Sequence, residues 1–318
     1  MFIMQVNKIK VLYIAGYSFS GSTILANILG EIESFFSAGE LRCIWEENLI
    51  KNFRCGCGSR FHDCSFWQEV FNKYPGGMQH INAQEIVGLQ EKRKHFPFML
   101  LPGNKQVLKP RFKKYLSSIE KLYQAIQSTT GSKVIVDSSK SPLYSYTLSM
   151  LPTIDLYIVH LVRDPRAVQY SCIKRKLRKK HRWEEHSIVE GCLTWNACNS
   201  AVELFWRSSL NHYLRLHYED FIQRPKVALQ QILQLVQEDV TQLPIKGKNI
   251  VNLTTNHTAI GNNNRFNAGA TQLKIDEQWK EKMSVEDRQI VTNLTLPWLL
   301  YYGYLNKNKF TSNYLKIT

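Results

Sequence analysis

A glycine-bounded loop between a predicted strand and a predicted helix constrains this chain more than any other feature. The loop is Gly16-Tyr17-Ser18-Phe19-Ser20-Gly21-Ser22-Thr23, and the apolar run 11–15 comes directly before it. It is followed by apolar side chains at the spacing of one helix face, namely Ile24, Leu25, Ile28 and Leu29. Because backbone N–H groups at the start of a helix bind anions, this segment predicts a phosphate-binding loop.

The loop departs from the common nucleoside-triphosphate pattern at one position. In G-x-x-x-x-G-K-[ST] the lysine reaches the β- and γ-phosphates, and Ser22 stands at that position here. The loop therefore favours a different activated nucleotide over transfer of a γ-phosphoryl group. A nucleoside-triphosphate-dependent small-molecule kinase stays open as an alternative, because Asp137 follows a predicted strand and is a possible magnesium ligand.

Short apolar segments alternate with helical patterns along the chain. Strands are predicted at 11–15, 35–38, 133–136, 156–162 and 213–218, and helices at 41–52, 83–94, 113–127, 167–178, 184–209, 225–237 and 285–302. This alternation predicts an α/β, P-loop-type three-layer fold, with a mainly parallel central sheet flanked by helices. We expect a single domain over residues 1–318, with a Cys-containing inserted cap at about 53–110, where Pro, Gly and Cys interrupt the pattern.

Polar groups follow four of the predicted strands. They are the glycine loop and the segments 137–140, 163–166 and 219–220. In open parallel sheets, ligands bind beyond the carboxyl ends of the strands. We therefore expect these four groups to lie around one site.

The charge balance favours an anionic ligand. The chain has 41 Lys and Arg against 26 Asp and Glu, a net charge of +15, and seven of the nine positions 174–182 are Lys or Arg. That run suits either a solvated helix face or a rim that attracts an anionic cofactor or substrate. No zinc-finger, RNP or helix-turn-helix signature accompanies it, so a nucleic-acid partner is not expected. A non-catalytic basic protein that binds polyanions stays open as a second alternative.

Two further absences bear on location. The sequence has no run of eighteen apolar residues, so a transmembrane helix or membrane anchor is not expected. No tripartite signal segment precedes the first predicted strand, and the sequence therefore predicts a cytoplasmic protein.

Two of these segments together resemble motifs of the PAPS-dependent sulfotransferases. Ser20-Gly21-Ser22-Thr23 resembles the family's 5′-phosphosulfate loop, and the segment from Arg163 to Ser171 resembles its 3′-phosphate motif, in which a Ser follows an Arg by eight residues. Supporting similarity to bacterial and carbohydrate-type members lies at 39–40, 137–140, 218–221 and 261–265. The resemblance implies in-line transfer of the sulfuryl group of PAPS to a hydroxyl or amine of a small-molecule or glycan acceptor, with release of adenosine 3′,5′-bisphosphate.

The resemblance also implies roles for particular residues. It places the 5′-phosphosulfate against the loop residues Tyr17, Ser18, Phe19, Ser20, Gly21, Ser22 and Thr23. Arg163 and Ser171 are expected at the 3′-phosphate, because an Arg fork and a Ser hydroxyl both donate to phosphate oxygens. Arg265 in the tail is expected as a further cofactor contact.

Two catalytic roles are expected outside these motifs. Many family members have Arg or Lys where this chain has Phe19, so we expect Lys140 to stabilise the leaving group, with Arg42 as a weaker candidate. Glu40 is the predicted general base, although a Glu there also suits a helix cap. The further candidates for the base are His257, Asp137 and His62.

A cysteine cluster lies at the start of the predicted cap. Cys55, Cys57 and Cys64 are metal-ligand residue types, with His62 between them and Cys43 upstream. Their spacing is not a repeated C-x₂-C pair, so a structural zinc site, a local disulfide and plain packed thiols all stay open. No metal is expected at the reaction centre.

Overall fold

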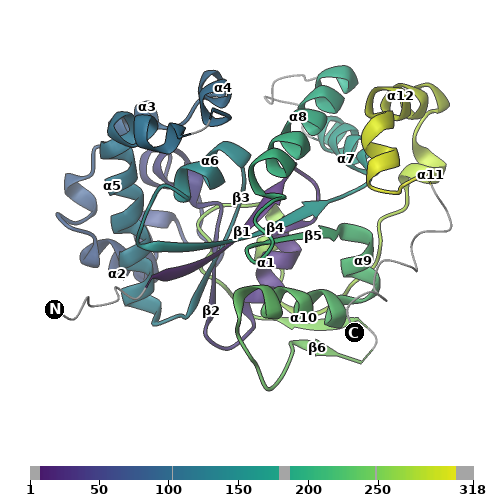
Figure 1. The fold of residues 1–318 in the computed structure, drawn as a ribbon. Helices are drawn as coiled ribbons and strands as arrows, with labels where there is room; N and C mark the ends of the chain where they lie inside the picture. The colour runs from purple at the N-terminus through teal and green to yellow at the C-terminus, as the bar shows by residue number, and fades with distance from the viewer. Residues whose placement is uncertain (1–7, 102, 179–186, 248, 306–318) are drawn as a thin grey trace.

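The computed structural model describes residues 8–101, 103–178, 187–247 and 249–305, and a parallel five-stranded sheet forms its centre (Figure 1). The strand order is β2-β3-β1-β4-β5, and all four neighbouring pairs run parallel. The strands are β1 (Ile9–Gly16), β2 (Phe35–Gly39), β3 (Val134–Lys140), β4 (Ile154–Val162) and β5 (Tyr213–His217). Since their carboxyl ends share one edge, the segments that follow them meet there, as the sequence predicts.

Helices cover both faces of this sheet because its strand side chains alternate between two apolar cores. Val11 and Tyr13 pack with residues of α5 (Asn104–Thr130), α6 (Pro142–Leu148) and α8 (Ile188–Trp206). Leu12 and Ile14 face the other core, with α1 (Ser22–Gly30), α9 (Tyr218–Gln223) and α10 (Pro225–Val236). Fully burying one such aliphatic side chain stabilises the fold by about 1.5–3 kcal/mol. The predicted three-layer α/β fold is confirmed.

The segment of the predicted cap packs beside α5. It contains the short helices α2 (Ser65–Lys73), α3 (Ala83–Leu89) and α4 (Phe96–Met99), with 3₁₀ turns η3 (Phe61–Asp63), η4 (Met78–His80) and η5 (Arg93–His95). Figure 1 shows these helices grouped on the left of the sheet, away from α7 (Pro165–Arg178), α11 (Trp279–Lys282) and α12 (Val285–Tyr301). The predicted division into one domain with a cap stays a prediction.

Two of the helix predictions differ from the structure because of contacts with segments that are distant in the sequence. The segment 41–52 forms a 3₁₀ turn, η1 (Leu41–Cys43), and then a π-helix, η2 (Ile44–Ile50), whose buried Asn48 donates from Nδ2 to the Ala259 carbonyl at 2.8 Å. Helix α3 ends at Leu89 rather than at residue 94. The chain leaves the helix there and places Glu91, which is 2% exposed, against Arg42.

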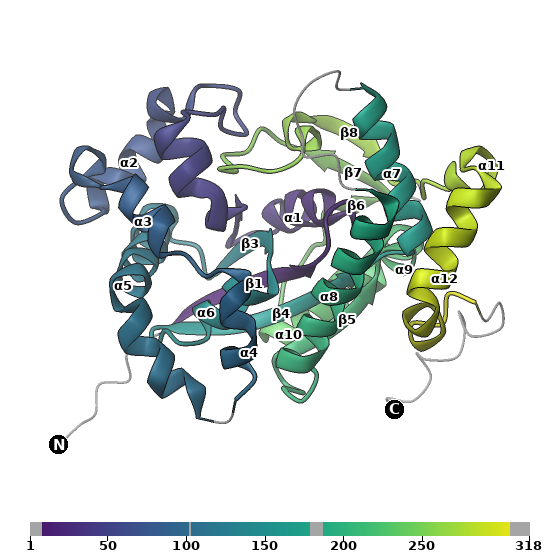
Figure 2. The same cartoon turned by 90° about the horizontal axis from the view of Figure 1, so that it is seen from above.

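The polar tail forms a second sheet that the sequence does not predict. Its antiparallel strands are β6 (Ile245–Lys246), β7 (Ile250–Leu253) and β8 (Gly269–Gln272), which are too short to show a clear alternation. Figure 2 shows β7 and β8 near α1, and Val251 and Leu253 belong to the core that α1 shares. Between these strands the chain returns to β2, where Ala259 donates from its N–H to the Ala38 carbonyl at 2.9 Å.

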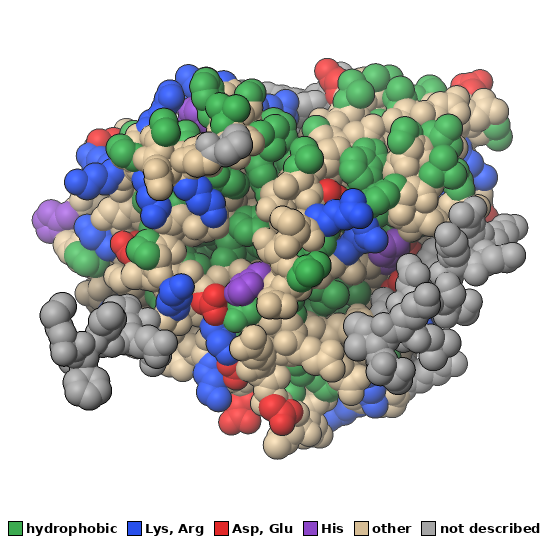
Figure 3. Space-filling model, viewed as in Figure 1, with side chains coloured by type: hydrophobic (Ala, Val, Ile, Leu, Met, Phe, Trp, Pro, Cys, Tyr) green, Lys and Arg blue, Asp and Glu red, His purple; other side chains and the backbone are tan. Residues whose placement is uncertain are grey.

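Within the described residues, no helix is both long and apolar enough to cross a lipid bilayer. Figure 3 shows Lys and Arg side chains at several separate places on one face of the molecule rather than in one patch. Of the basic run 174–182, residues 174–178 belong to α7, and 179–182 lie outside the described residues.

Candidate active site

The glycine loop begins at the carboxyl end of β1, in the middle of the sheet. Gly21 has φ 90° and is the N-cap of α1, and no side chain caps this helix. A methyl group added at Gly21 would lie 2.5 Å from Cδ2 of Tyr218, so only glycine fits this close approach without a shift. The first N–H groups of α1 have no acceptor within the helix and are available to an anion.

Ser20 contributes a further polar group to this loop. It is 2% exposed, and its Oγ has no hydrogen-bond partner among the described residues. A buried hydroxyl without a partner is costly, and a bound phosphate or sulfate oxygen would satisfy it.

Arg163 connects the glycine loop to the start of α7. It follows β4, is 7% exposed, and donates from Nη1 to the Phe19 carbonyl at 2.8 Å. Its guanidinium lies 4.5 Å from the centre of the Tyr218 ring. Nη1 is also 3.5 Å from Ser171 Oγ, and Nε has no partner within the described part of the chain. The two sequence motifs are therefore in direct contact.

The segment after Arg163 is held by a partly buried acid, Glu219. Asp164 donates from its backbone N–H to Glu219 Oε1 at 3.2 Å, and Tyr304 donates from its hydroxyl to Glu219 Oε2 at 3.0 Å. Burial, and then the neighbouring Asp164, raise the pKa of Glu219 to about 7. Glu219, at the start of α9, thus holds the 163–166 turn in place.

Two charged residues near this motif were not predicted as site residues. Asp276 lies beside Arg163, with its carbonyl 3.5 Å from Arg163 Nη2, and it accepts from Lys174 Nζ at 3.1 Å. Arg175 lies with its guanidinium carbon 5.6 Å from the Phe19 ring centre. A cation therefore approaches the loop at Phe19, from α7 instead of from the loop itself. In the sequence, only the high density of basic residues at 174–182 indicates that such a cation is present.

The two predicted catalytic residues contact each other. Lys140 Nζ lies 2.5 Å from Glu40 Oε1, and their side chains are 14% and 20% exposed. Lys140 has φ 67°, and a register shift in the β1–β3 ladder places it opposite Ala15, next to the glycine loop. Arg42, the weaker candidate for the cation, instead pairs with the buried Glu91 at 2.5 Å.

Asp137 lies in β3, the strand that also contains Lys140. It is fully buried and accepts hydrogen bonds from the Tyr123 hydroxyl at 2.5 Å, the Ser139 N–H at 2.8 Å and the Ser139 hydroxyl at 2.5 Å. Burial raises the pKa of this carboxyl to about 6. Since its oxygens are occupied and have no access to solvent, the kinase alternative loses its magnesium ligand.

Arg265 approaches the glycine loop from the tail. It is 6% exposed, donates from Nη2 to the Arg54 carbonyl at 3.0 Å and from Nη1 to the Gly261 carbonyl, and its Nε has no partner in the described ranges. A methyl group added at Gly261 would be 3.8 Å from Thr23 Oγ1, so this turn touches the start of α1.

The cysteine cluster gains a fourth member from the tail. The side chains of Cys55, Cys57, Cys64 and His257, called here the Cys–His cluster, place one ligand atom each within 4.8 Å of all the others. The thiols are free, so the local disulfide is absent from this structure. His62, the neighbouring candidate in the sequence, instead lies with Nε2 3.1 Å from the Leu49 carbonyl.

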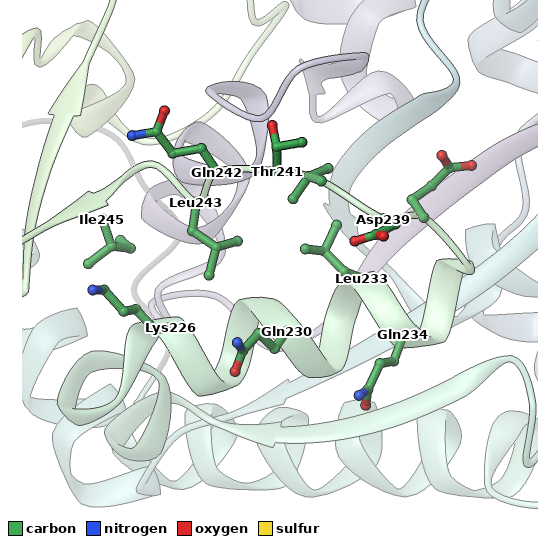
Figure 4. Close-up of a pocket in the computed structure, with 11 residues that line it drawn as sticks. Lys226, Gln230, Leu233, Gln234, Asp239, Thr241, Gln242, Leu243 and Ile245 are labelled. Atoms are coloured by element: carbon green, nitrogen blue, oxygen red, sulfur yellow. The ribbon is translucent and has the colours of Figure 1, made fainter.

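A cavity of about 710 Å³ lies elsewhere, between α10 and the segment 238–245 (Figure 4). Its lining includes Lys226, Gln230 and Leu243, and none of the predicted site residues contributes to it. The candidate site is therefore defined by convergent polar groups at the edge of the sheet rather than by this cavity.

These features define a three-layer α/β protein with a glycine loop and, within the described residues, unpartnered buried donors at the carboxyl edge of its central sheet. Residues 12–242 match the model of the sulfotransferase family, and the chain belongs to that family. It is a sulfotransferase, as the resemblance of its motifs predicts. Among curated protein sequences, none matches this chain.

Three solved structures are similar to this chain, and the first of them supports the fold. The sulfotransferase domain from the curacin biosynthetic pathway is 17% identical with a TM-score of 0.50, and the match covers 90% of this chain and 97% of that one. The sulfotransferase domain of the Synechococcus PCC 7002 olefin synthase is 18% identical with a TM-score of 0.49, over 91% and 95% of the two chains. Retinol dehydratase in a complex with retinol and PAP is 13% identical with a TM-score of 0.45, over 92% and 82%.

Proposed function

We propose that this sulfotransferase takes the sulfuryl group from PAPS and transfers it to a hydroxyl or amine of a small-molecule or glycan acceptor. The contact of Arg163 with both the Phe19 carbonyl and Ser171 carries the proposal, since it joins a 5′-phosphosulfate loop to a 3′-phosphate motif. The chain fits this donor because buried polar atoms around the loop lack partners in the described residues, namely Ser20 Oγ, Arg163 Nε and Arg265 Nε.

The roles of these residues follow from what each can donate. The N–H groups at the start of α1 and the Ser20 hydroxyl bind the 5′-phosphosulfate oxygens. Arg163 donates to the 3′-phosphate, and Ser171, whose hydroxyl donates to the Ala167 carbonyl at 2.9 Å, keeps that arginine in place. Arg265 adds positive charge from the tail.

Glu40 acts on the acceptor, and Lys140 acts on the phosphate that leaves. Glu40 accepts the proton of the acceptor hydroxyl as the new S–O bond forms. Lys140 donates to the phosphate oxygen that keeps the electron pair when the old S–O bond breaks. Their ion pair of 2.5 Å keeps the cation and the base adjacent, beside the loop, before the acceptor enters. A cytoplasmic location stays part of this proposal.

Calorimetric titration with adenosine 3′,5′-bisphosphate tests the proposal. We expect micromolar affinity (about −8 kcal/mol), weaker binding of ATP with magnesium, and at least a 100-fold loss of bisphosphate affinity in Arg163→Ala. Arg224→Ala is the matched control, because it removes the same charge at a distant exposed pair with Asp220. Tighter binding of ATP, or unchanged affinity in Arg163→Ala, contradicts the proposal.

A further inference from the structure

The Cys–His cluster brings together two segments that are distant in the sequence. Cys55, Cys57 and Cys64 belong to the loop before α2, and His257 lies 193 residues after Cys64, between β7 and η6 (Asn263–Phe266). Cys55 and Cys64 are buried, while Cys57 and His257 are partly buried. Thiolate sulfur and imidazole nitrogen are the ligands that zinc takes in closed structural sites.

Three of the separations between ligand atoms match those around one tetrahedral ion, and all four atoms lie within 4.8 Å of one another. With Zn–S about 2.3 Å and Zn–N about 2.0–2.1 Å, a tetrahedron places two sulfurs about 3.8 Å apart and a sulfur and a nitrogen about 3.5 Å apart. Here Cys57 Sγ lies 3.7 Å from Cys64 Sγ, and His257 Nδ1 lies 3.4 Å from Cys64 Sγ and 3.7 Å from Cys55 Sγ. Packed thiols explain one such distance, but not four ligand atoms that converge on one point.

The surroundings hold the histidine in the orientation that a metal ligand needs. Its ring stacks on Phe66, with the ring centres 4.8 Å apart and the planes at 18°. Its carbonyl accepts a hydrogen bond from Trp67 Nε1 at 2.9 Å. Both aromatic residues follow Cys64 in α2, so the element that starts at a cysteine also fixes the histidine. These contacts fix the plane of the ring and the backbone that carries it.

Tight turns bring the cysteines together. Gly58 donates from its N–H to the Cys55 carbonyl at 2.9 Å, and Cys55 donates to the Ser59 carbonyl at the same distance. Gly56 donates to the Thr258 carbonyl at 2.9 Å, which pairs the cysteine turn with the backbone next to His257. A methyl group added at Gly56 would lie 2.1 Å from Asn256 Oδ1, so the two segments are in close contact.

We propose that Cys55, Cys57, Cys64 and His257 bind one structural Zn²⁺, which fastens the cysteine turn to the tail. Four protein ligands leave no open position, so this ion binds no substrate and activates no water. The site is independent of the glycine loop, and neither its ligands nor its test depends on the proposed donor.

The position of the cluster gives this ion an indirect role at the active site. Three residues beyond His257, the Ile260 carbonyl accepts from the Glu40 N–H at 3.0 Å. On the other segment, the Arg54 carbonyl next to Cys55 accepts from Arg265 Nη2 at 3.0 Å. The ion therefore fixes the backbone that positions Glu40 and Arg265, and both are positioned through it rather than bound to it.

Elemental analysis of the full-length protein tests the proposal directly. We expect about one zinc per chain in the wild type after dialysis without chelator, and a loss of most of that metal in Cys57→Ser and in His257→Ala. The matched controls are Cys43→Ser and His62→Ala, which change the same residue types in the neighbouring sequence but outside the cluster, and they should retain the metal.

A cobalt experiment on the wild type covers the case in which a cluster variant fails to fold. Protein stripped of metal and refilled with Co²⁺ should show the intense visible absorption of a tetrahedral ion and a thiolate-to-metal charge-transfer band. A wild type that takes up neither Zn²⁺ nor Co²⁺, a weak octahedral spectrum, or full metal content in the His257→Ala variant overturns the proposal. Binding of adenosine 3′,5′-bisphosphate is measured separately from metal content. Failure of the zinc proposal can therefore be distinguished from failure of the proposed function.

Discussion

The glycine loop and the Cys–His cluster lie at two ends of the same tail segment, yet they are assembled in different ways. The loop takes its ligand groups from consecutive residues 16–23 and depends on backbone conformation, with φ 90° at Gly21. The cluster takes three ligands from a turn and the fourth from a residue 193 positions later. A local motif is therefore enough to find the first site, whereas the second needs the fold to complete it.

The two regions also differ in what their polar groups lack. Around the glycine loop, donors such as Arg163 Nε and the Ser20 hydroxyl are buried without partners in the described chain, which fits an anion that binds and leaves. In the cluster, the ligand side chains contact one another and the ring of His257 stacks on Phe66, which fits a permanent ion. On the two proposals above, the loop is a site for turnover and the cluster a site for stability, and three changes test that separation.

The largest effect is expected for Lys140→Ala. Loss of the cation next to the leaving oxygen should lower kcat by about 100- to 1000-fold, as for other preorganised donors to a developing charge. The measurement is turnover of PAPS with the best acceptor from a screen of phenols, sugars and amines. Lys133→Ala, which removes an exposed lysine near Glu238, is the control and should keep full turnover. An unchanged kcat in Lys140→Ala would contradict the proposed role of this lysine. A changed metal content in the same variant would mean that the two regions are not separate.

Next comes Gly21→Ala, which tests how rigidly the loop is preformed. The new methyl group would meet the Tyr218 ring at 2.5 Å at a position with φ 90°, so overpacking and backbone strain add. We expect the free energy of unfolding to fall by about 3 kcal/mol, measured by chemical denaturation. Gly131→Ala shares a positive φ of 63° but meets no atom within 4 Å, and should cost about 1 kcal/mol. Equal losses in the two variants would refute close packing at the loop.

The smallest effect is expected for the pH dependence of the unfolding free energy that Asp137 causes. This residue lies in β3, as does Lys140. Burial raises the pKa of this carboxyl from 3.8 to about 6, so the folded protein binds more protons than the unfolded chain between these values. Its contribution to stability is therefore complete below about pH 4 and is lost as the pH rises through 6. Relative to wild type, Asp137→Asn should gain about 2 kcal/mol in unfolding free energy between pH 4 and pH 7. Denaturation curves at both pH values measure this gain, and a constant difference between the two proteins contradicts it.

The fold was largely predictable, and each departure has a physical cause. The five predicted strands and most helices appear because their apolar spacing matches the faces that they bury. The strands of the small tail sheet were missed, since two to four residues are too few to show alternation. The end of α3 at Leu89 was missed too, because the pairing of Glu91 with Arg42 decides it, and Arg42 is 49 positions away.

In the candidate site, too, some contacts were predictable from the sequence and others were not. The contact of Arg163 with the glycine loop follows from parallel strands that end at one edge, which sequence spacing predicts. Arg175 beside Phe19 and Asp276 beside Arg163 were missed, because their contacts join segments whose separation carries no pattern. Asp137 was considered as a base and a magnesium ligand, and its complete burial is visible only in the structure.

By itself the sequence determined the α/β architecture, the anion-binding loop and the family, because each depends on residues that are close together in the chain or repeat at a fixed period. Tertiary structure alone decided that Lys140 pairs with Glu40, that Arg42 is committed to Glu91, and that His257 completes the set of three cysteines. The physical reason is distance along the chain. Hydrogen bonds, ion pairs and metal–ligand contacts act over a few ångströms, and only the packed layers bring these distant side chains within that range.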